Sequence, residues 1–156
     1  MRDPYMLVTA KDIPENADLG ELLQHPFIRY SAEQQMGRQI EAQLRRVRAI
    51  PTKSFEMSTN QALFAMVAAT GGWAISPASS VHGTLSHRPA EDLNLRLAPL
   101  PFPAFSRSLS LYARKDILSS LPERTAETLR QSLTTVYEGT NSSISLPVTP
   151  TVSHAY

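Results

Sequence analysis

The stretch Phe55–Pro77, FEMSTNQALFAMVAATGGWAISP, decides the fold class. Phe55–Met57 has the composition of a short strand, and the apolar run Leu63–Ala69 predicts a helix that Gly71-Gly72 ends. Trp73–Ile75 follows as an apolar run without alternation, which is typical of a strand buried in a parallel sheet. Strand, helix and strand in this order predict a right-handed crossover between parallel neighbours. Because the helix is apolar on most of its faces, we expect it to be largely buried.

The preceding residues repeat this arrangement. Pro26–Tyr30 predicts a strand, and Ser31 with Gln34 has the capping-box spacing that begins a helix, as Ser58 has with Gln61 before the second helix. The first helix has a single apolar stripe, formed by Met36, Ile40, Leu44 and Val47. With a further strand at Tyr5–Thr9, the chain is predicted to be an α/β domain with a mostly parallel sheet flanked by helices.

The C-terminal half shows weaker patterns. Residues 79–92 are expected to form a loop, Leu93–Leu97 alternates as a strand does, and Ser108–Arg114 alternates again. Ser120 and Pro122 begin a last helix, whose apolar stripe is Ala126, Leu129, Leu133 and Val136. From residue 138 the chain is rich in Ser and Thr and poor in charge, so residues 138–156 are expected to be a disordered tail.

The composition excludes several classes of protein. The 156 residues include no Cys, which excludes a disulfide framework, a thiolate metal site and a Cys nucleophile. The 15 Lys and Arg against 14 Asp and Glu give a net charge of +1, which argues against binding of the whole molecule to DNA or anionic membranes by charge. No apolar run has the length of a signal-peptide core or a membrane span. We therefore expect a cytoplasmic domain without a membrane partner.

A series of short motifs resembles the effector-binding domain of LysR-type transcriptional regulators, from about Tyr5 to Tyr137. Each motif is weak alone, and their common order and spacing make the resemblance specific. The motifs are His25-Pro26-Phe27-Ile28-Arg29-Tyr30-Ser31, Gly37-Arg38-Gln39-Ile40, Leu44-Arg45-Arg46, Phe55-Glu56, Met66-Val67-Ala68-Ala69, Gly72-Trp73-Ala74-Ile75 with Pro77, Pro99-Leu100-Pro101, Ser106-Arg107, Leu109–Arg114 and Leu121-Pro122. Thr70-Gly71-Gly72 differs from the family's Gly-x-Gly before the Trp. Thr70 is unfavourable in the left-handed conformation that ends a helix, and Gly71 could adopt it as the helix cap instead.

The resemblance implies a periplasmic-binding-protein-like fold of type 2, with two α/β lobes, a ligand cleft between them and two strands that cross between the lobes. The crossing strands would be Tyr5–Thr9 and Leu109–Arg114. Residues 1–137 would form a partial effector-binding domain, mainly the second lobe over about 10–108, with a returning first-lobe strand and helix over 109–137. The family's helix-turn-helix has no counterpart in these residues, so we expect an N-terminally truncated regulator that makes no direct DNA contact.

The candidate binding residues follow from the predicted sheet. Ligands of open parallel sheets bind beyond the carboxyl ends of the strands, where helix N-termini offer N–H donors and a partial positive charge. We expect a small anionic metabolite to contact three such corners, whose residues are Arg29, Tyr30, Ser31, Ser58, Thr59, Asn60, Ser76 and Pro77. Ordinary helix capping by Ser31 and Ser58 is the competing interpretation. For Arg29 the alternative is a position on the solvated edge of the sheet.

Other chemistries find little support in the sequence. His82 and His87, with Glu91 and Asp92 nearby, lack the tight spacing of a zinc site, so no metal is expected. There is no Gly-x-Ser-x-Gly elbow, phosphate loop or dinucleotide glycine pattern, so we predict no enzyme activity, no catalytic residue and no cofactor. Glu41 precedes Arg45 by four residues, the favourable order for a surface ion pair. The cations around the first helix fit a solvated face better than a nucleic-acid patch; they are Arg38, Arg45, Arg46, Arg48 and Lys53.

Two functions remain open. The first is the effector-binding (co-inducer-binding) regulatory domain of a LysR-type DNA-binding transcription regulator, which would act as a homo-oligomer. The second is a truncated interaction protein that pairs with a full-length LysR-type regulator, or a gene remnant. A stand-alone small-molecule carrier is a weaker option, because no secretion signal is present. In each case the strand Leu109–Arg114 and the last helix would lack first-lobe partners, and the apolar surface left exposed favours association.

Overall fold

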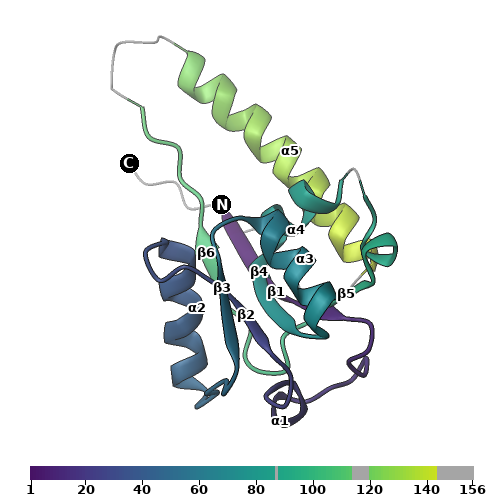
Figure 1. Ribbon diagram of the computed structural model, residues 1–156. Helices are drawn as coiled ribbons and strands as arrows, with labels where there is room; N and C mark the ends of the chain where they lie inside the picture. The colour runs from purple at the N-terminus through teal and green to yellow at the C-terminus, as the bar shows by residue number, and fades with distance from the viewer. Residues whose placement is uncertain (87, 114–119, 144–156) are drawn as a thin grey trace.

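The computed structural model describes residues 1–86, 88–113 and 120–143. A six-stranded sheet forms its centre, in the order β3-β2-β4-β1-β5, with β6 paired to β1 outside this path (Figure 1). The strands are β1 (Arg2–Ala10), β2 (Phe27–Tyr30), β3 (Ser54–Met57), β4 (Trp73–Pro77), β5 (Leu95–Ala98) and β6 (Ser106–Ser108). The helices are α1 (Leu19–Leu22), α2 (Gln35–Arg46), α3 (Asn60–Thr70), α4 (Ala78–Leu85), the 3-10 helix η1 (Ala90–Leu93) and α5 (Leu121–Ser143).

The sheet is mixed. β2 is parallel to β3 and to β4, as the strand–helix–strand pattern predicts. β1 is antiparallel to β4, β5 and β6, so the α/β class is confirmed but the sheet is less parallel than expected. The residues of β1 do not reveal this direction, because a strand covered on both faces is apolar throughout whichever way it runs.

The helices α2 and α3 cover opposite faces of the sheet. Side chains alternate along β2, so Arg29 faces α2, where it contacts Glu41, and Tyr30 faces α3, where it contacts Asn60. The predicted apolar stripe of α2 is confirmed, since all of its members belong to the core or pack against it. The largest side chains of that core are Trp73, Tyr5, Tyr30 and Phe64.

Both predicted capping boxes are corrected by the structure. α2 has Gln34 as its N-cap rather than Ser31, because the Ser31 hydroxyl accepts a backbone N–H within the preceding turn. The Gln34 side chain instead donates to the Ser58 carbonyl at 2.9 Å. α3 is capped by the hydroxyl of Thr59 rather than by Ser58, and it ends as expected at Gly71, which adopts a left-handed φ of 63°.

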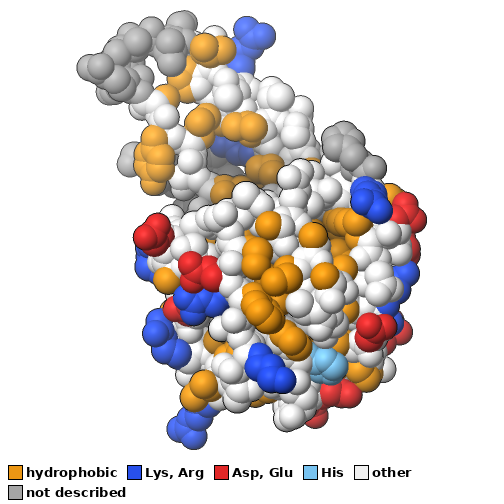
Figure 2. Space-filling view, in the orientation of Figure 1, with side chains coloured by type: hydrophobic (Ala, Val, Ile, Leu, Met, Phe, Trp, Pro, Cys, Tyr) orange, Lys and Arg blue, Asp and Glu red, His pale blue; other side chains and the backbone are white. Residues whose placement is uncertain are grey.

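Helix α3 is only half buried. Its core-facing residues are Leu63, Phe64 and Val67, whereas Ala62, Ala65 and Ala69 are exposed. Figure 2 shows hydrophobic side chains gathered over this helix. The expectation of a largely buried helix was wrong because an alanine counts as apolar in a sequence pattern, yet exposing its small side chain to water costs little.

The C-terminal half contains more helix than predicted. Residues 78–85 and 90–93 form α4 and η1 where a loop was expected. Serines, a threonine and Gly83 give α4 a low helix propensity, and packing of Ala78 and Val81 into the core overrides it. The predicted strand Ser108–Arg114 is displaced toward the N-terminus: β6 covers Ser106–Ser108, residues 109–113 form no regular element, and residue 114 lies outside the described residues.

Helix α5 projects from one end of the sheet (Figure 1). It continues to Ser143, six residues into the range 138–156 that was expected to be a tail; the rest of that range lies outside the described residues. Leu133 and Val136 pack against the core beside α4. Near the start of the helix, Leu121 and Leu129 are 52% and 45% exposed. The apolar stripe of α5 is therefore covered only in its C-terminal half.

Candidate functional site

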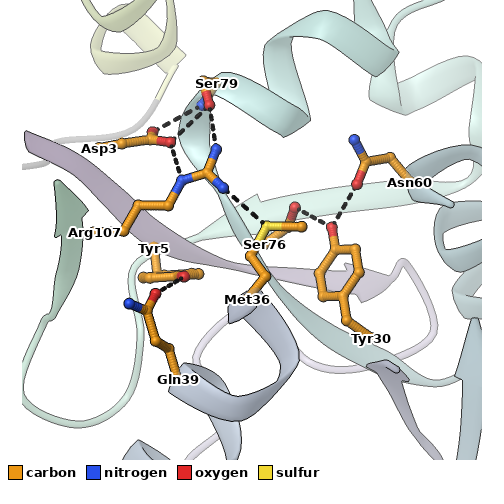
Figure 3. Close-up of polar contacts among 9 residues, drawn as sticks. All are labelled: Asp3, Tyr5, Tyr30, Met36, Gln39, Asn60, Ser76, Ser79 and Arg107. Atoms are coloured by element: carbon orange, nitrogen blue, oxygen red, sulfur yellow. Dashed lines mark hydrogen bonds and ion pairs between the residues drawn. The ribbon is translucent and has the colours of Figure 1, made fainter. Parts of the chain in front are cut away.

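The carboxyl ends of β2, β3 and β4 lie side by side, because these three strands run in the same direction. The buried Tyr30 hydroxyl, at the end of β2, joins the end of β4 to the start of α3, the helix that follows β3 (Figure 3). It donates to Asn60 Oδ1 at 2.8 Å, and it lies 2.8 Å from Ser76 Oγ, which can donate to it. Burial raises the pKa of Tyr30, so the hydroxyl stays protonated and keeps this bridge at neutral pH.

The chain segments at this edge are tied together by their backbones as well. The Ser31 N–H donates to the Met57 carbonyl at 3.3 Å, which joins the end of β2 to the end of β3. Four predicted residues remain at least partly accessible here, and we name them the β2–β4 corner: Ser31, Ser58, Thr59 and Asn60. Tyr30, Ser76 and Pro77 are buried behind them. The structure thus brings together seven of the eight predicted residues.

A second polar cluster adjoins the corner at the start of α4 (Figure 3). The buried Asp3 accepts the Ser79 N–H at 3.1 Å and the Ser79 hydroxyl at 2.7 Å. Arg107 donates from Nε to the same carboxylate at 2.8 Å, and it also contacts Ser79 Oγ and Met36 Sδ, each at 3.2 Å. The N-cap of α4 is Pro77, which makes no side-chain cap. Asp3 therefore caps α4 from another element, and a carboxylate already occupies this helix N-terminus.

Tyr5 connects this second cluster to α2. Its hydroxyl donates to Gln39 Oε1 at 2.8 Å, and its ring stacks on Phe105 with centroids 4.3 Å apart. Burial raises the pKa of Tyr5 to about 12, although the nearby Arg107 guanidinium lowers it in part. Tyr5 therefore acts as a neutral hydrogen-bond donor.

Arg29 is the one predicted site residue that lies elsewhere. Its guanidinium is on the α2 face, where it forms ion pairs with Glu41 at 2.8 Å and with Glu56 at 2.7 Å. The hydrogen bond from Arg29 lowers the pKa of the Glu56 carboxyl. Glu41 consequently pairs with Arg29 across two elements, and the predicted surface pair with Arg45 does not form.

Several residues of the polar network were missed by the sequence analysis, namely Asp3, Tyr5, Met36, Gln39, Ser79 and Arg107. The predicted first strand began at Tyr5 and left out Asp3, and Ser79 fell in a predicted loop. The sequence did contain a signal for Asp3. If the strand predicted from Tyr5 begins earlier and includes Asp3, this carboxylate becomes buried and needs a positively charged or hydrogen-bonding partner. Arg107 stood in a resemblance motif but was given no role.

The corner presents hydroxyls, an amide and a helix N-terminus, which are hydrogen-bonding groups that can bind a small polar ligand. Among the described residues no cluster of three or more His, Cys, Asp and Glu side chains could hold a metal ion; His87 lies outside them. Within the same ranges, every helix is too short or too polar to cross a membrane.

Comparison with known proteins identifies the relatives of this chain. The family model described as the LysR substrate binding domain matches residues 1–134. The solved effector binding domain of BenM with its effector benzoate is 22% identical, with a TM-score of 0.57, and the match covers 89% of this chain and 62% of that one. A putative transcriptional regulator from Vibrio parahaemolyticus is 18% identical, with a TM-score of 0.62 and coverages of 88% and 64%.

A third solved relative, the effector binding domain of QuiR in complex with shikimate, is 16% identical, with a TM-score of 0.51 and coverages of 68% and 49%. This chain thus spans about half to two thirds of the length of these relatives. No curated protein sequence matches it. The likeness to solved structures shows the periplasmic-binding-protein-like fold, and the family match extends over all but the last residues. The chain therefore belongs to the LysR substrate binding domain family, the effector-binding regulatory domain of LysR-type transcriptional regulators.

Proposed function

We propose that this chain binds a small anionic effector at the β2–β4 corner, as the ligand-binding part of a LysR-type regulator. The observation on which the proposal rests is the pair of hydrogen bonds of Tyr30, which joins the ends of β2 and β4 to the first residue of α3 at one accessible edge. Two relatives support a carboxylate as the ligand, because they were solved with benzoate and shikimate.

Asn60 is the residue best placed to recognise an anion. Tyr30 donates to its Oδ1, so the amide nitrogen points away and remains a free donor (Figure 3). Asn60 is also the first residue of α3, where the helix dipole favours negative charge. The start of α4 is already occupied by Asp3, which leaves the N-termini of α2 and α3 for a ligand. Ser31 and Ser58 supply hydroxyls, whereas Tyr30 and Ser76 are positioning residues.

The experiment is a calorimetric titration of the chain with benzoate and with shikimate. Asn60→Asp keeps the acceptor for Tyr30 and replaces the free donor by a negative charge, so we expect affinity to fall about tenfold or more. Gln24→Glu introduces the same charge at an exposed position outside the corner and should leave affinity unchanged. Absence of saturable binding, or an equal loss in both variants, would overturn the proposal.

A second candidate function, pairing with another regulator chain, is favoured by a different observation. Leu111 and Tyr112 are 50% and 90% exposed, and they lie in the same C-terminal region as the exposed Leu121 and Leu129 of α5. We expect these exposed apolar side chains to drive self-association, which sedimentation of the wild type and of Leu129→Ser would detect. A monomer at all concentrations would exclude self-association through these side chains and leave the effector proposal intact.

A further inference from the structure

A cavity of about 220 Å³ opens between α2 and the first residues of β2 and β3. We name it the α2 cavity. Its apolar lining is Phe27, Leu44, Ala49, Ile50 and Pro51, and its polar lining is Arg29, Glu41, Arg45 and Ser54. Phe27 begins β2 and Tyr30 ends it, so the α2 cavity and the β2–β4 corner lie at opposite ends of this strand. The two places share no lining residue.

The local backbone explains why the cavity exists. α2 ends at Arg46, and Arg48 then adopts a left-handed φ of 56°, which turns the chain so that Ala49–Pro51 forms a wall beside the helix. A non-glycine residue rarely adopts this conformation. Ala49 is buried and its N–H donates to the Leu44 carbonyl at 2.8 Å, whereas Ile50 is 76% exposed at the rim.

Three charged side chains line the cavity, Arg29, Glu41 and Arg45, and Arg45 is the one of these that forms no ion pair with a described residue. Arg29 is held between Glu41 and Glu56, so this group has a net charge of about −1. Within the described part of the chain, no hydrogen bond or ion pair is found for four neighbouring cationic side chains, which are Arg45, Arg46, Arg48 and Lys53. Charged side chains gather along the edge that α2 occupies (Figure 2).

Stabilisation of the C-terminus of α2 does not account for these cations. A helix dipole amounts to about half a negative charge at this end, which one arginine would balance. The last carbonyls of the helix are also satisfied by the backbone, because the N–H groups of Val47, Arg48 and Ala49 donate to them. The arginines are therefore free to bind a ligand.

We propose that the α2 cavity is a second binding site, which takes a small amphipathic anion: a carboxylate on an aromatic or short aliphatic body. An enclosed apolar cavity of about 150 Å³ accommodates a benzene ring; the α2 cavity is larger but open to solvent, so one ring would fit with one side exposed. The ring would lie against Phe27 and Leu44, and the carboxylate would face Arg45 at the rim. Glu41 also lines the cavity, and its charge is compensated in part by Arg29 at 2.8 Å, so the carboxylate of the ligand would lie on the Arg45 side.

The test uses the full chain with ¹³C-labelled isoleucine methyl groups, titrated with 4-fluorobenzoate and followed by NMR. We expect a saturable shift of the Ile50 methyl signal, identified by its loss in Ile50→Val. Arg45→Gln should weaken the binding about tenfold or more, whereas Arg46→Gln, an exposed neighbour that does not line the cavity, should change it less than about twofold. Ser54→Leu, at an exposed lining position, should block the cavity while the thermal unfolding transition is retained.

Three results would overturn the proposal: no shift at Ile50, an equal loss in Arg45→Gln and Arg46→Gln, or equal binding of the uncharged 4-fluorobenzyl alcohol. Failure here is distinguishable from failure of the proposed function. Asn60→Asp should weaken binding at the β2–β4 corner and leave the Ile50 titration unchanged, while Arg45→Gln should do the reverse.

Discussion

Asp3 and Arg107 are direct partners across the antiparallel strands β1 and β6, and their side chains form an ion pair of 2.8 Å. The Asp3 carboxylate is fully buried and also caps α4 through Ser79, while the Arg107 side chain is 25% exposed. A single carboxylate therefore fixes two strands and a helix to one another. Such a pair is costly to break, because removal of one partner leaves the other charge without compensation.

Asp3→Asn should destabilise the protein by about 3 kcal/mol, the lower end of the range for a broken buried ion pair. Asparagine can still accept the Ser79 N–H but leaves the Arg107 charge unpaired. Urea unfolding followed by circular dichroism measures the loss. Asp92→Asn, an exposed change without a described side-chain bond, should stay within about 0.5 kcal/mol of wild type. Equal effects of the two variants would contradict the role given to Asp3.

Gly37→Ala should distort the β2–β4 corner. A Cβ at Gly37 would clash with the Ser31 carbonyl oxygen and lie 2.9 Å from that of Tyr30, and neither backbone atom can move without shifting the end of β2. We expect a loss of about 2 kcal/mol, together with weaker benzoate binding. Gly83→Ala, also within a helix but with nothing inside 4 Å, should instead stabilise by about 0.5 kcal/mol. Thermal unfolding of both variants checks this contrast.

The buried tyrosines should make stability fall at alkaline pH. Tyr5 ionises near its ordinary pKa of 10.0 when unfolded and only near 12 when folded, so the folded state holds more protons between these values. The free energy of unfolding therefore decreases as pH rises from 10 toward 12. Tyr5→Phe should show a smaller decrease over this window in urea unfolding. A parallel decline in both proteins would show that Tyr5 does not contribute.

The pKa of the Glu56 carboxyl should depend on Arg29. Its pKa lies below the ordinary 4.5 because Arg29 donates hydrogen bonds to it, so Arg29→Gln should raise this pKa toward the ordinary value. Arg45→Gln removes a positive charge from the same face without touching Glu56 and should leave its pKa unchanged. A carboxyl ¹³C titration by NMR measures both. An unchanged pKa in Arg29→Gln would show that another group stabilises the carboxylate.

The parts of the fold that were predictable are those in which local pattern and tertiary packing agree. The stripe of α2 and the left-handed stop at Gly71 follow from spacing and residue type alone. α4 was missed because its low propensity is overridden by burial of Ala78 and Val81, which no local pattern records. The antiparallel direction of β1 likewise depends on its pairing with β4, β5 and β6, which are distant in the sequence.

The residues of the candidate site also fall into those that local sequence could place and those that depend on distant residues. The common position of Ser31, Ser58 and Asn60 could be predicted because they follow strands that run in the same direction, and parallel strands end at one edge. Arg29 lies apart from them because it alternates with Tyr30 and therefore faces the other side of the sheet. The cap that Asp3 provides for α4 joins residues 76 positions apart, a distance over which capping signals in the sequence give no information.

The position of β1 has a consequence for synthesis of the protein. β1 lies inside the sheet between β4 and β5, yet it leaves the ribosome before either of them. The unit from β2 to α3 can assemble while β1 has no partner, and one backbone edge of β1 stays unpaired until β5 has emerged at Ala98. Non-local strand pairing of this kind is slow and leaves an aggregation-prone intermediate. A nascent chain arrested before this point would present β1 as a binding segment for holdase chaperones.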